Sequence, residues 1–445
     1  MPSLVQTVDD VRQACREHEV QFIQLHITDI LGSIKHVDLP LSRLEKALAG
    51  EVMFDGSAIE GFVRTRESDM YLRPDPRTFR ILPWKHDRGV TARLVCDVHS
   101  LDGSPFVGDP RQALKRVCAE AAAMGFTCQA GPEPEFFLFR RDAAGRASTE
   151  TNDLASYFDV APLDIGESVR EEIVSVLQRA QFDLESSHHE AAPGQHEIDF
   201  KYADALTMAD SFMLFRLVVR TTAAARGLHA TFMPKPVADV NGSGMHLHQS
   251  LFRNGTNAFF DEHGPDKLSA VARHYLAGLL DHARGYTAIT NPLVNSYKRL
   301  VPGYEAPTFV TWSHREHSPL VRIPARRAVG TRLELRSPDP ACNPYLALAV
   351  MFKAGLDGVK QGLEPPRQAG TAVYRMTPEE RRQMGIQPLP RDLGEALDAM
   401  EGDDVVQGAL GEHIFTRFLE AKRIEWDYYC RQVHRWELDQ YLATF

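Results

Sequence analysis

The chain has 445 residues, with 50 Lys and Arg against 60 Asp and Glu, so its formal net charge is −10. Hydrophobic residues make up 43% and charged residues 25%, which excludes a disordered, collagen-like or low-complexity chain. The negative charge argues against a nucleic-acid surface built on phosphate neutralisation. A charged partner is therefore expected to be a small ion or a metabolite.

The cysteines predict a reducing compartment. Six are scattered along the chain without a CxxC pair, which favours neither a disulfide framework nor a zinc site. The first twenty residues are acidic where a signal peptide needs a basic start and an apolar run. No window approaches the ~20 apolar residues of a membrane span. We expect a cytoplasmic protein with no membrane or nucleic-acid partner.

The first hundred residues predict a small mixed unit. Apolar residues at helical spacing follow a Thr7 cap, and alternating residues then indicate a strand with one wet face. The predicted elements are a helix over 7–18, a strand over 23–27, a turn at 29–32 and a strand over 93–99. Turn and helix-breaking residues crowd positions 101–110, so we divide the chain into domains 1–107 and 108–445.

The second domain alternates short strands with helices. Asp109 caps and Pro110 starts the first helix, which should run to Met124. Further helices are predicted over 168–179, 208–226, 266–282, 345–359 and 411–441. There is no internal repeat. The expected class is α+β, with a small N-terminal domain and a large domain of catalytic size.

Several strands carry more charge on one face than a structural sheet needs. Residues two apart in an extended strand point the same way. The groups formed in this way are Glu133 with Glu135, Glu197 with Asp199 and Lys201, His246 with His248 and Ser250, and Arg332 with Glu334 and Arg336. For any single strand, a solvated face is the simpler interpretation. The accumulation of such strands favours a shared site.

Convergence of these faces would require cations, because close carboxylates repel one another. The candidate ligands are five carboxylates and one imidazole: Glu133, Glu135, Glu190, Glu197, Glu334 and His246. Oxygen-rich sets of this kind suit Mg²⁺ or Mn²⁺ better than zinc. The interleaved arginines suit a nucleotide phosphate. No P-loop or GxGxxG motif occurs, so metals and arginines would have to hold the phosphates.

Six motifs in one order carry a resemblance over nearly the whole chain. They are Phe54-Asp-Gly-Ser-Ala-Ile-Glu-Gly-Phe62, Gly131-Pro-Glu-Pro-Glu-Phe136, His188-His-Glu-Ala-Ala-Pro-Gly-Gln-His-Glu197, Asn241-Gly-Ser-Gly-Met-His-Leu-His248, Asn295-Ser-Tyr-Lys-Arg299 through Glu305-Ala-Pro307, and Arg332-Leu-Glu-Leu-Arg-Ser-Pro-Asp-Pro340 through Pro344. The sequence resembles type I glutamine synthetases. Residues 410–427 resemble the shorter, Gram-positive-like alpha subtype.

The resemblance implies a β-grasp-like N-terminal domain and a catalytic domain whose antiparallel sheet forms a half-barrel with helices. It implies ATP-dependent ligation of ammonia to the γ-carboxylate of L-glutamate through γ-glutamyl phosphate, giving L-glutamine, ADP and phosphate. It also implies a homo-oligomer, a dodecamer of two stacked hexameric rings in which neighbouring subunits share active sites.

The resemblance also assigns roles residue by residue. One Mg²⁺ or Mn²⁺ would be held by Glu135, Glu190 and Glu197, and the other by Glu133, His246 and Glu334. The residues matched to glutamate binding are Glu135, Asn241, Gly242, His246, Arg299, Glu305 and Arg336. Those matched to ATP are Glu185, Phe200, His248, Ser250, Arg322 and Arg332. The expected catalytic residues are Asp55 as the ammonium base, Glu305 on a closing flap, and Arg322 and Arg336 on the phosphoryl group. Arg64 matches a position of glutamine feedback inhibition.

Two positions depart from the family pattern. His317 stands where a phosphate-contacting arginine is usual, with Arg315 two residues away, and Ala58 replaces a serine beside the predicted ammonium pocket. Tyr374 falls where some relatives carry an adenylylated tyrosine, but its flanking residues differ, so a structural role is expected.

Two other functions stay open at this point. One is a γ-glutamyl ligase for a larger amine such as a polyamine or ethanolamine, and the other is a non-catalytic nitrogen-sensing relative. Retention of Asp55 and Glu305 favours ammonia as the amine, and retention of all six inferred metal ligands argues against the non-catalytic alternative.

Overall fold

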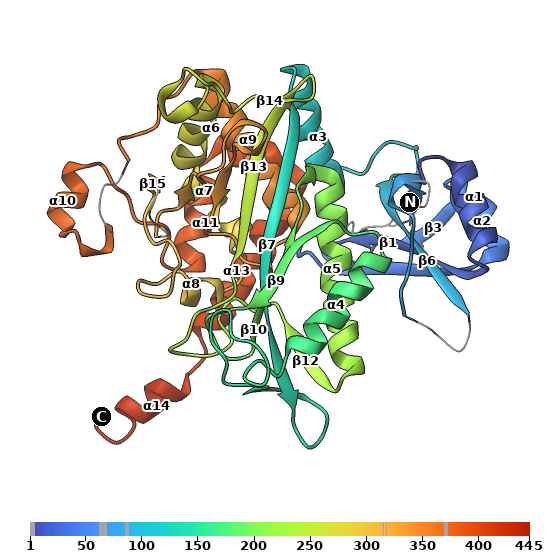
Figure 1. Ribbon diagram of the computed structural model, residues 1–445, viewed down its shortest axis with the longest axis horizontal. Helices are drawn as coiled ribbons and strands as arrows, with labels where there is room; N and C mark the ends of the chain where they lie inside the picture. The colour runs from blue at the N-terminus through green and yellow to red at the C-terminus, as the bar shows by residue number, and fades with distance from the viewer. Residues whose placement is uncertain (1–4, 62–68, 85–88, 315, 317, 369–372) are drawn as a thin grey trace.

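The computed structural model describes residues 5–61, 69–84, 89–314, 316, 318–368 and 373–445. Its strands form two separate sheets, one in each predicted domain (Figure 1). The predicted boundary after residue 107 falls between the last strand of the first sheet and helix α3.

The N-terminal sheet has the strand order β2-β1-β6-β4-β3, with β5 paired to β6. Its strands are β1 (Val20–Thr28), β2 (Ile34–Pro40), β3 (Val52–Asp55), β4 (Asp69–Pro74), β5 (Arg80–Ile81) and β6 (Val90–His99). Helices α1 (Val8–Glu17) and α2 (Leu44–Leu48) belong to the same unit. Thr7 caps α1 as predicted, in a capping box with Asp10. Side chains such as Ile23, Leu25 and Leu94 fill a core separate from that of the large domain.

The large sheet is built around one long strand, β7 (Thr127–Arg141). The path β15-β16-β17-β13-β7-β10-β9 curls into a half-barrel, with β8, β11 and β12 also on β7 and β14 on β13. These strands are β8 (Ala147–Thr151), β9 (Leu184–His189), β10 (Gln195–Phe200), β11 (Ala203–Asp204), β12 (Leu228–Thr231), β13 (Met245–Arg253), β14 (Thr256–Asn257), β15 (Trp312–Ser313), β16 (Val321–Arg322) and β17 (Leu333–Leu335). The predicted α+β class is confirmed.

Helices pack against the sheet and one another, and β7 and β13 run nearly vertically between two groups of them in Figure 1. They are α3 (Pro110–Ala123), α4 (Glu167–Arg179), α5 (Ala205–Ala225), α6 (Ala270–Asp281), α7 (Ala283–Thr290), α8 (Ser296–Arg299), α9 (Pro344–Gln361), α10 (Pro378–Gln383), α11 (Leu393–Glu401), α12 (Asp404–Leu410), α13 (Glu412–Cys430) and α14 (Arg435–Tyr441). Asp109 caps α3 and Pro110 starts it, as the sequence predicted. No helix among these described segments is long and apolar enough to cross a membrane.

Two helix predictions were wrong at their ends. The helix expected from residue 266 begins at Ala270, because Asp266 has a left-handed φ of 54° and Ser269 supplies the cap instead. The helix expected over 411–441 is broken between Cys430 and Arg435 into α13 and α14. Helix α14 carries the chain away from the body of the molecule (Figure 1).

Candidate active site

The pairing register gathers the charged residues on one face of the large sheet. Residues directly opposite each other in neighbouring antiparallel strands point to the same side. The opposed pairs are Glu133 with His246, Glu135 with Glu197, Glu197 with His188, His248 with Glu334, and Glu334 with Arg322. The strand faces singled out in the sequence therefore converge.

Glu133, His246 and Glu334 offer ligand atoms that all lie within 4.8 Å of one another. His246 Nδ1 is 3.6 Å from Glu133 Oε2 and 3.7 Å from Glu334 Oε1. Glu334 is fully buried, and its two oxygens accept from Arg322 Nε and Arg336 Nη1, each at 2.5 Å. Burial opposes ionisation, but His246, His248 and the two arginines around it outweigh burial and lower the pKa of Glu334 to about 2. This group is the predicted second metal set.

Hydrogen bonds connect Glu133 with two residues predicted to bind ATP, His248 and Arg332. Arg332 Nε donates to His248 Nδ1 at 3.0 Å, and His248 Nε2 lies 2.5 Å from Glu133 Oε1. The arginine takes the Nδ1 lone pair, so the ring proton sits on Nε2 and is donated to Glu133. Burial works against the charged carboxylate, yet His248 and His246 outweigh it and hold the pKa of Glu133 well below its usual range.

The other predicted metal set, Glu135, Glu190 and Glu197, is close enough for mutual repulsion but is less tightly grouped. Burial, and then the charge of Glu190, raises the pKa of Glu135 to about 8. Burial, Glu135 and Asp199 together raise the pKa of Glu197 well above its ordinary value. Glu135 Oε2 accepts from Gln195 Nε2 at 2.7 Å and from the Gly244 amide at 3.0 Å.

Asp199 is a site residue to which the sequence assigned no role. Its carboxylate lies within 4.8 Å of ligand atoms of Glu197 and His188, and it also accepts from Ser186 Oγ. His188 Nε2 in turn lies 2.9 Å from Glu190 Oε1. The signal was present, since Asp199 shares a strand face with Glu197, but no motif singled it out.

A cavity of about 220 Å³ adjoins Glu133. Five residues predicted to contact ATP line it: Glu185, Phe200, His248, Ser250 and Arg332. The sixth predicted ATP contact, Arg322, forms an ion pair with Glu334 instead. Gln129, Tyr202, Arg326 and Thr331 also line the cavity and were missed, because their roles depend on strands that the sequence does not align.

Two of the predicted glutamate-binding residues, Gly242 and Arg299, meet at a closely packed backbone segment before β13. Arg299 is buried, and its Nη atoms donate to the carbonyls of Arg336 at 3.1 Å and Ser337 at 2.7 Å. A Cβ at Gly244 would lie 2.4 Å from Arg299 Nη2, and one at Gly242 would lie 2.2 Å from a backbone oxygen. Glycine at both positions lets this segment lie against its neighbours. Asn241 begins the segment and is half-buried.

The predicted flap and base come from elsewhere in the chain. Glu305 has a left-handed φ of 57° two residues after Gly303. Burial, and then the charges of Glu190, Glu197 and Glu305, raise the pKa of Tyr157. Asp55 ends β3 in the separate N-terminal sheet, where its Oδ1 accepts from the Ser57 amide at 2.8 Å. Ala58 follows in the same turn. Arg64, Arg315 and His317 lie outside the described residues.

Both halves of the chain match known family models. Residues 19–101 match the glutamine synthetase β-grasp domain, and residues 107–441 match the glutamine synthetase catalytic domain. The chain belongs to the glutamine synthetase family. The predicted family and its enzyme class are confirmed.

Full-length relatives agree with this family. The chain is 56% identical over 443 residues to a glutamine synthetase of Thermus thermophilus, covering 99% of each, and 54% identical over 446 residues to one of Staphylococcus aureus, covering 100% of each. Its fold matches a GmaS/ADP complex with a TM-score of 0.88 and 35% identity, covering 97% of this chain and 99% of that chain. A Plasmodium falciparum glutamine synthetase matches with a TM-score of 0.87 and 25% identity, covering 98% of each chain.

Proposed function

We propose that this chain joins ammonia to the γ-carboxylate of L-glutamate at the expense of ATP, through γ-glutamyl phosphate, to give L-glutamine, ADP and phosphate. Curated relatives of 54–56% identity over the full length support ATP-dependent glutamine synthesis. The observation that carries the proposal is one sheet face on which two sets of carboxylates, buried arginines and a cavity lined by predicted nucleotide-binding residues adjoin.

The donor set fits two Mg²⁺ or Mn²⁺ ions. Five carboxylates and one imidazole are the ligands that these hard cations take. Glu135, Glu190 and Glu197 would hold one ion, and Glu133, His246 and Glu334 the other. The raised pKa values of Glu135 and Glu197 support the first set, because positive charge is what these crowded carboxylates lack. When bound, such ions neutralise phosphate charge and stabilise the charge that develops during phosphoryl transfer.

The surrounding residues bind and orient the two substrates. Glu185, Phe200, His248, Ser250 and Arg332 would hold ATP, while Asn241, Gly242 and Arg299 would hold the amino-acid end of glutamate. A carboxylate is a poor electrophile, so its γ-oxygen must first take the phosphoryl group. Arg322 and Arg336 flank Glu334 and would stabilise the three oxygens of that group as it moves.

The second half-reaction needs a base and a dry site. Ammonium must lose a proton before it can attack, and Asp55 is the carboxylate that would take it. An acyl phosphate hydrolyses readily, so Glu305 on its strained turn would close the site against water.

We also propose a cytoplasmic homo-oligomer, a dodecamer of two stacked hexameric rings with active sites shared between neighbours. The position of Asp55 in a separate sheet supports shared sites. Exposed apolar side chains on and beyond α14, among them Trp436, Leu442 and Phe445, support burial of that segment against another chain. The six free cysteines support a reducing compartment.

A phosphate-release assay tests the activity. Purified full-length protein with Mg²⁺, ATP and glutamate should release phosphate when ammonia is supplied, with glutamine formed in equal amount. A panel of methylamine, ethanolamine and putrescine serves as the comparison. A kcat/KM for any of these amines above that for ammonia would contradict the proposal in favour of a ligase for a larger amine.

A further inference from the structure

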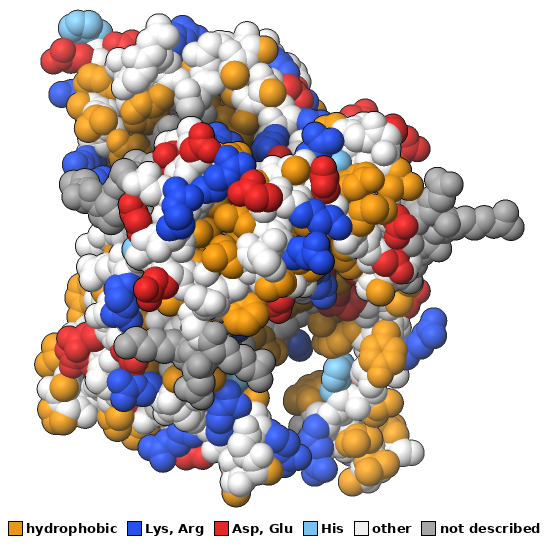
Figure 2. Space-filling model, turned by 90° about the vertical axis from the view of Figure 1, so that its right-hand side faces the viewer, with side chains coloured by type: hydrophobic (Ala, Val, Ile, Leu, Met, Phe, Trp, Pro, Cys, Tyr) orange, Lys and Arg blue, Asp and Glu red, His pale blue; other side chains and the backbone are white. Residues whose placement is uncertain are grey.

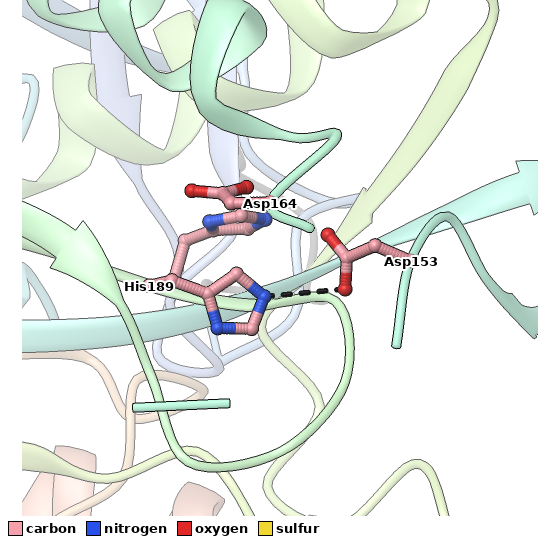
Figure 3. Close-up of side chains that lie close together, drawn as sticks. Asp153, Asp164 and His189 are labelled. Carbon is pink, nitrogen blue, oxygen red and sulfur yellow. Dashed lines mark hydrogen bonds and ion pairs between the residues drawn. The ribbon is translucent and has the colours of Figure 1, made fainter. Parts of the chain in front are cut away.

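A second group of charged side chains lies behind the predicted metal ligands and is not used by the mechanism above. Asp153, Asp164, His189 and His196 are all buried, with ligand atoms within 4.8 Å of one another. Figure 3 shows the first three of these side chains gathered together. Asp153 and Asp164 come from the segment before α4, whereas His189 and His196 are opposed residues of β9 and β10. His189 directly precedes Glu190, and His196 directly precedes Glu197.

One oxygen of Asp153 ties this group to the turn that carries Glu190. Asp153 Oδ1 accepts from His189 Nε2 at 3.2 Å, as Figure 3 shows, and from the backbone amides of Gly194 at 2.8 Å and Ala155 at 3.3 Å. His189 Nδ1 lies 2.7 Å from the Glu190 carbonyl oxygen. Both ring nitrogens of His189 therefore face oxygen atoms, one on Asp153 and one on the Glu190 carbonyl.

The other two members of the group, Asp164 and His196, both contact the buried Arg170. Arg170 Nη1 donates to Asp164 Oδ2 at 2.7 Å and to His196 Nδ1 at 2.9 Å. The buried guanidinium of Arg170 therefore neutralises one of the two carboxylates. A divalent metal ion here would lie beside this cation, and removing like charges from water without net attraction is costly. The group is better suited to hold its neighbours in place than to bind a metal of its own.

The turn between β9 and β10 is held at both ends by Asp153. At one end, His189 reaches the Glu190 carbonyl; at the other, the Gly194 amide binds Asp153 directly. Gly194 has a φ of 69°, and a Cβ there would lie 2.9 Å from a backbone oxygen, so the turn has little room to shift. The next residue, Gln195, donates to Glu135. The position of Asp153 thus bears on Glu190, Glu197 and Glu135.

We propose that Asp153, acting through His189, is a positioning residue that sets the metal affinity of the Glu135–Glu190–Glu197 site. This inference rests on the metal assignment in the proposed function. Groups that orient metal ligands through a hydrogen bond typically change metal affinity or activity by 10–100-fold when mutated.

The test is Mn²⁺ binding to the full-length protein, followed by electron paramagnetic resonance of the free ion. In Asp153→Asn a neutral amide oxygen replaces the carboxylate oxygen that accepts from His189, Gly194 and Ala155. Hydrogen bonds to a neutral acceptor are weaker than those to a carboxylate, so both ends of the turn are held less firmly. We expect about tenfold weaker Mn²⁺ binding in one class of sites. Activity should return to the wild-type kcat at saturating Mn²⁺, which a merely structural defect would not allow.

Asp403→Asn is the matched control. Asp403 pairs with His282 at 2.9 Å, is largely shielded from solvent with 12% of its side chain exposed, and caps α12 outside the site. Asparagine keeps the cap, so this variant should bind Mn²⁺ as the wild type does. Equal weakening in both variants, or unchanged binding in Asp153→Asn, would refute the positioning role.

Glu190→Gln separates this inference from the assignment on which it rests. If Glu190→Gln leaves Mn²⁺ binding unchanged, the proposed metal set itself is wrong. If Glu190→Gln loses one site while Asp153→Asn does not weaken it, only the positioning role fails. Should Asp153→Asn not fold, His189→Gln takes its place. The glutamine amide can keep a hydrogen bond to Asp153 but loses the one to the Glu190 carbonyl. Unchanged Mn²⁺ binding in His189→Gln would equally refute the positioning role.

Discussion

Glu334 is at once buried, paired with two arginines and part of a candidate metal site. It is fully buried, accepts from Arg322 and Arg336, and lies within ligand distance of His246 and Glu133. A buried carboxylate with two cations at hydrogen-bonding distance is held ionised and in one orientation. We therefore expect its charge, more than its volume, to matter for turnover.

The prediction at this scale is that Glu334→Gln, which keeps the shape and removes the charge, lowers kcat at least about 100-fold, the scale for losing one transition-state-stabilising group. The measurement is phosphate release as a function of Mg²⁺ concentration. Glu120→Gln, which breaks an ion pair with Lys353 away from the site, is the control and should keep its activity. Wild-type turnover and metal dependence in Glu334→Gln would exclude Glu334 as a ligand.

At the scale of elements, a buried ion-pair network joins the two domains. Arg111 on α3 bonds Asp97 of β6 at 2.6 Å, Asp210 of α5 at 2.8 Å and Asp75, just after β4, at 2.9 Å. Tyr345 of α9 adds a bond to Asp210 at 2.7 Å. One guanidinium thus connects the end of the N-terminal sheet with helices of the catalytic domain.

Removing that guanidinium leaves Asp75, Asp97 and Asp210 without the cation that they share. We predict that Arg111→Met lowers the free energy of unfolding by about 3–5 kcal/mol, the usual cost of breaking a buried pair. Arg77→Met is the matched control, because Arg77 binds the same Asp75 from an exposed position and should cost about 1 kcal/mol or less. Urea unfolding of both variants measures the difference. Similar losses in the two variants would contradict the network's role.

The same network predicts a pH dependence. Burial favours the neutral form of Asp75, but Arg77 and Arg111 outweigh burial and hold its pKa well below its usual range. Because the pKa is lower in the folded state than the unfolded value of about 4, the charged form stabilises the fold above that pH. The contribution is lost as the pH falls toward the folded-state value.

Asp75→Asn makes this dependence measurable. The difference in unfolding free energy between wild type and Asp75→Asn should stay constant from about pH 7 to pH 5 and shrink below about pH 4. Urea unfolding followed by tryptophan fluorescence at each pH gives the difference. A gap that widens on acidification would show that the assigned direction of the pKa shift is wrong.

At the scale of the whole molecule, the candidate base and the candidate metal ligands lie in different domains. Asp55 belongs to the N-terminal sheet, whereas all six predicted metal ligands follow the domain boundary. Figure 2 faces the N-terminal side, where acidic, basic and hydrophobic side chains are intermixed. In the shared site proposed above, the small domain of one chain would complete the site of its neighbour.

Mixing two inactive chains separates a shared site from an internal one. Asp55→Ala and Glu334→Gln chains, unfolded and refolded together in equal amounts, should recover about a quarter of wild-type activity if sites form head-to-tail between neighbours. In a random ring, that fraction of interfaces pairs an intact small domain with an intact large one. Each variant refolded alone is the control. Background activity from correctly assembled mixed rings would mean that each site lies within one chain.

The sequence by itself determined what depends on neighbouring residues. Strand alternation placed Glu133 with Glu135 and His246 with His248, and the caps Thr7 and Asp109 marked two helix starts, because both signals act over a few residues. The motifs identified the family and named the candidate ligands. The sequence placed the start of α6 four residues early, since only the chain path shows that Asp266 turns left-handed.

The tertiary structure alone decided which of these strand faces meet. Register in the half-barrel sets Glu334 opposite His248 and Arg322, across gaps of many residues that no local pattern spans. It also brings Asp153 under His189, and Asp199 beside Glu197, although neither aspartate stands out in the sequence. The physical reason is that strand pairing and buried ion pairs join residues that are far apart in the sequence. Such residues become neighbours only when the sheet closes.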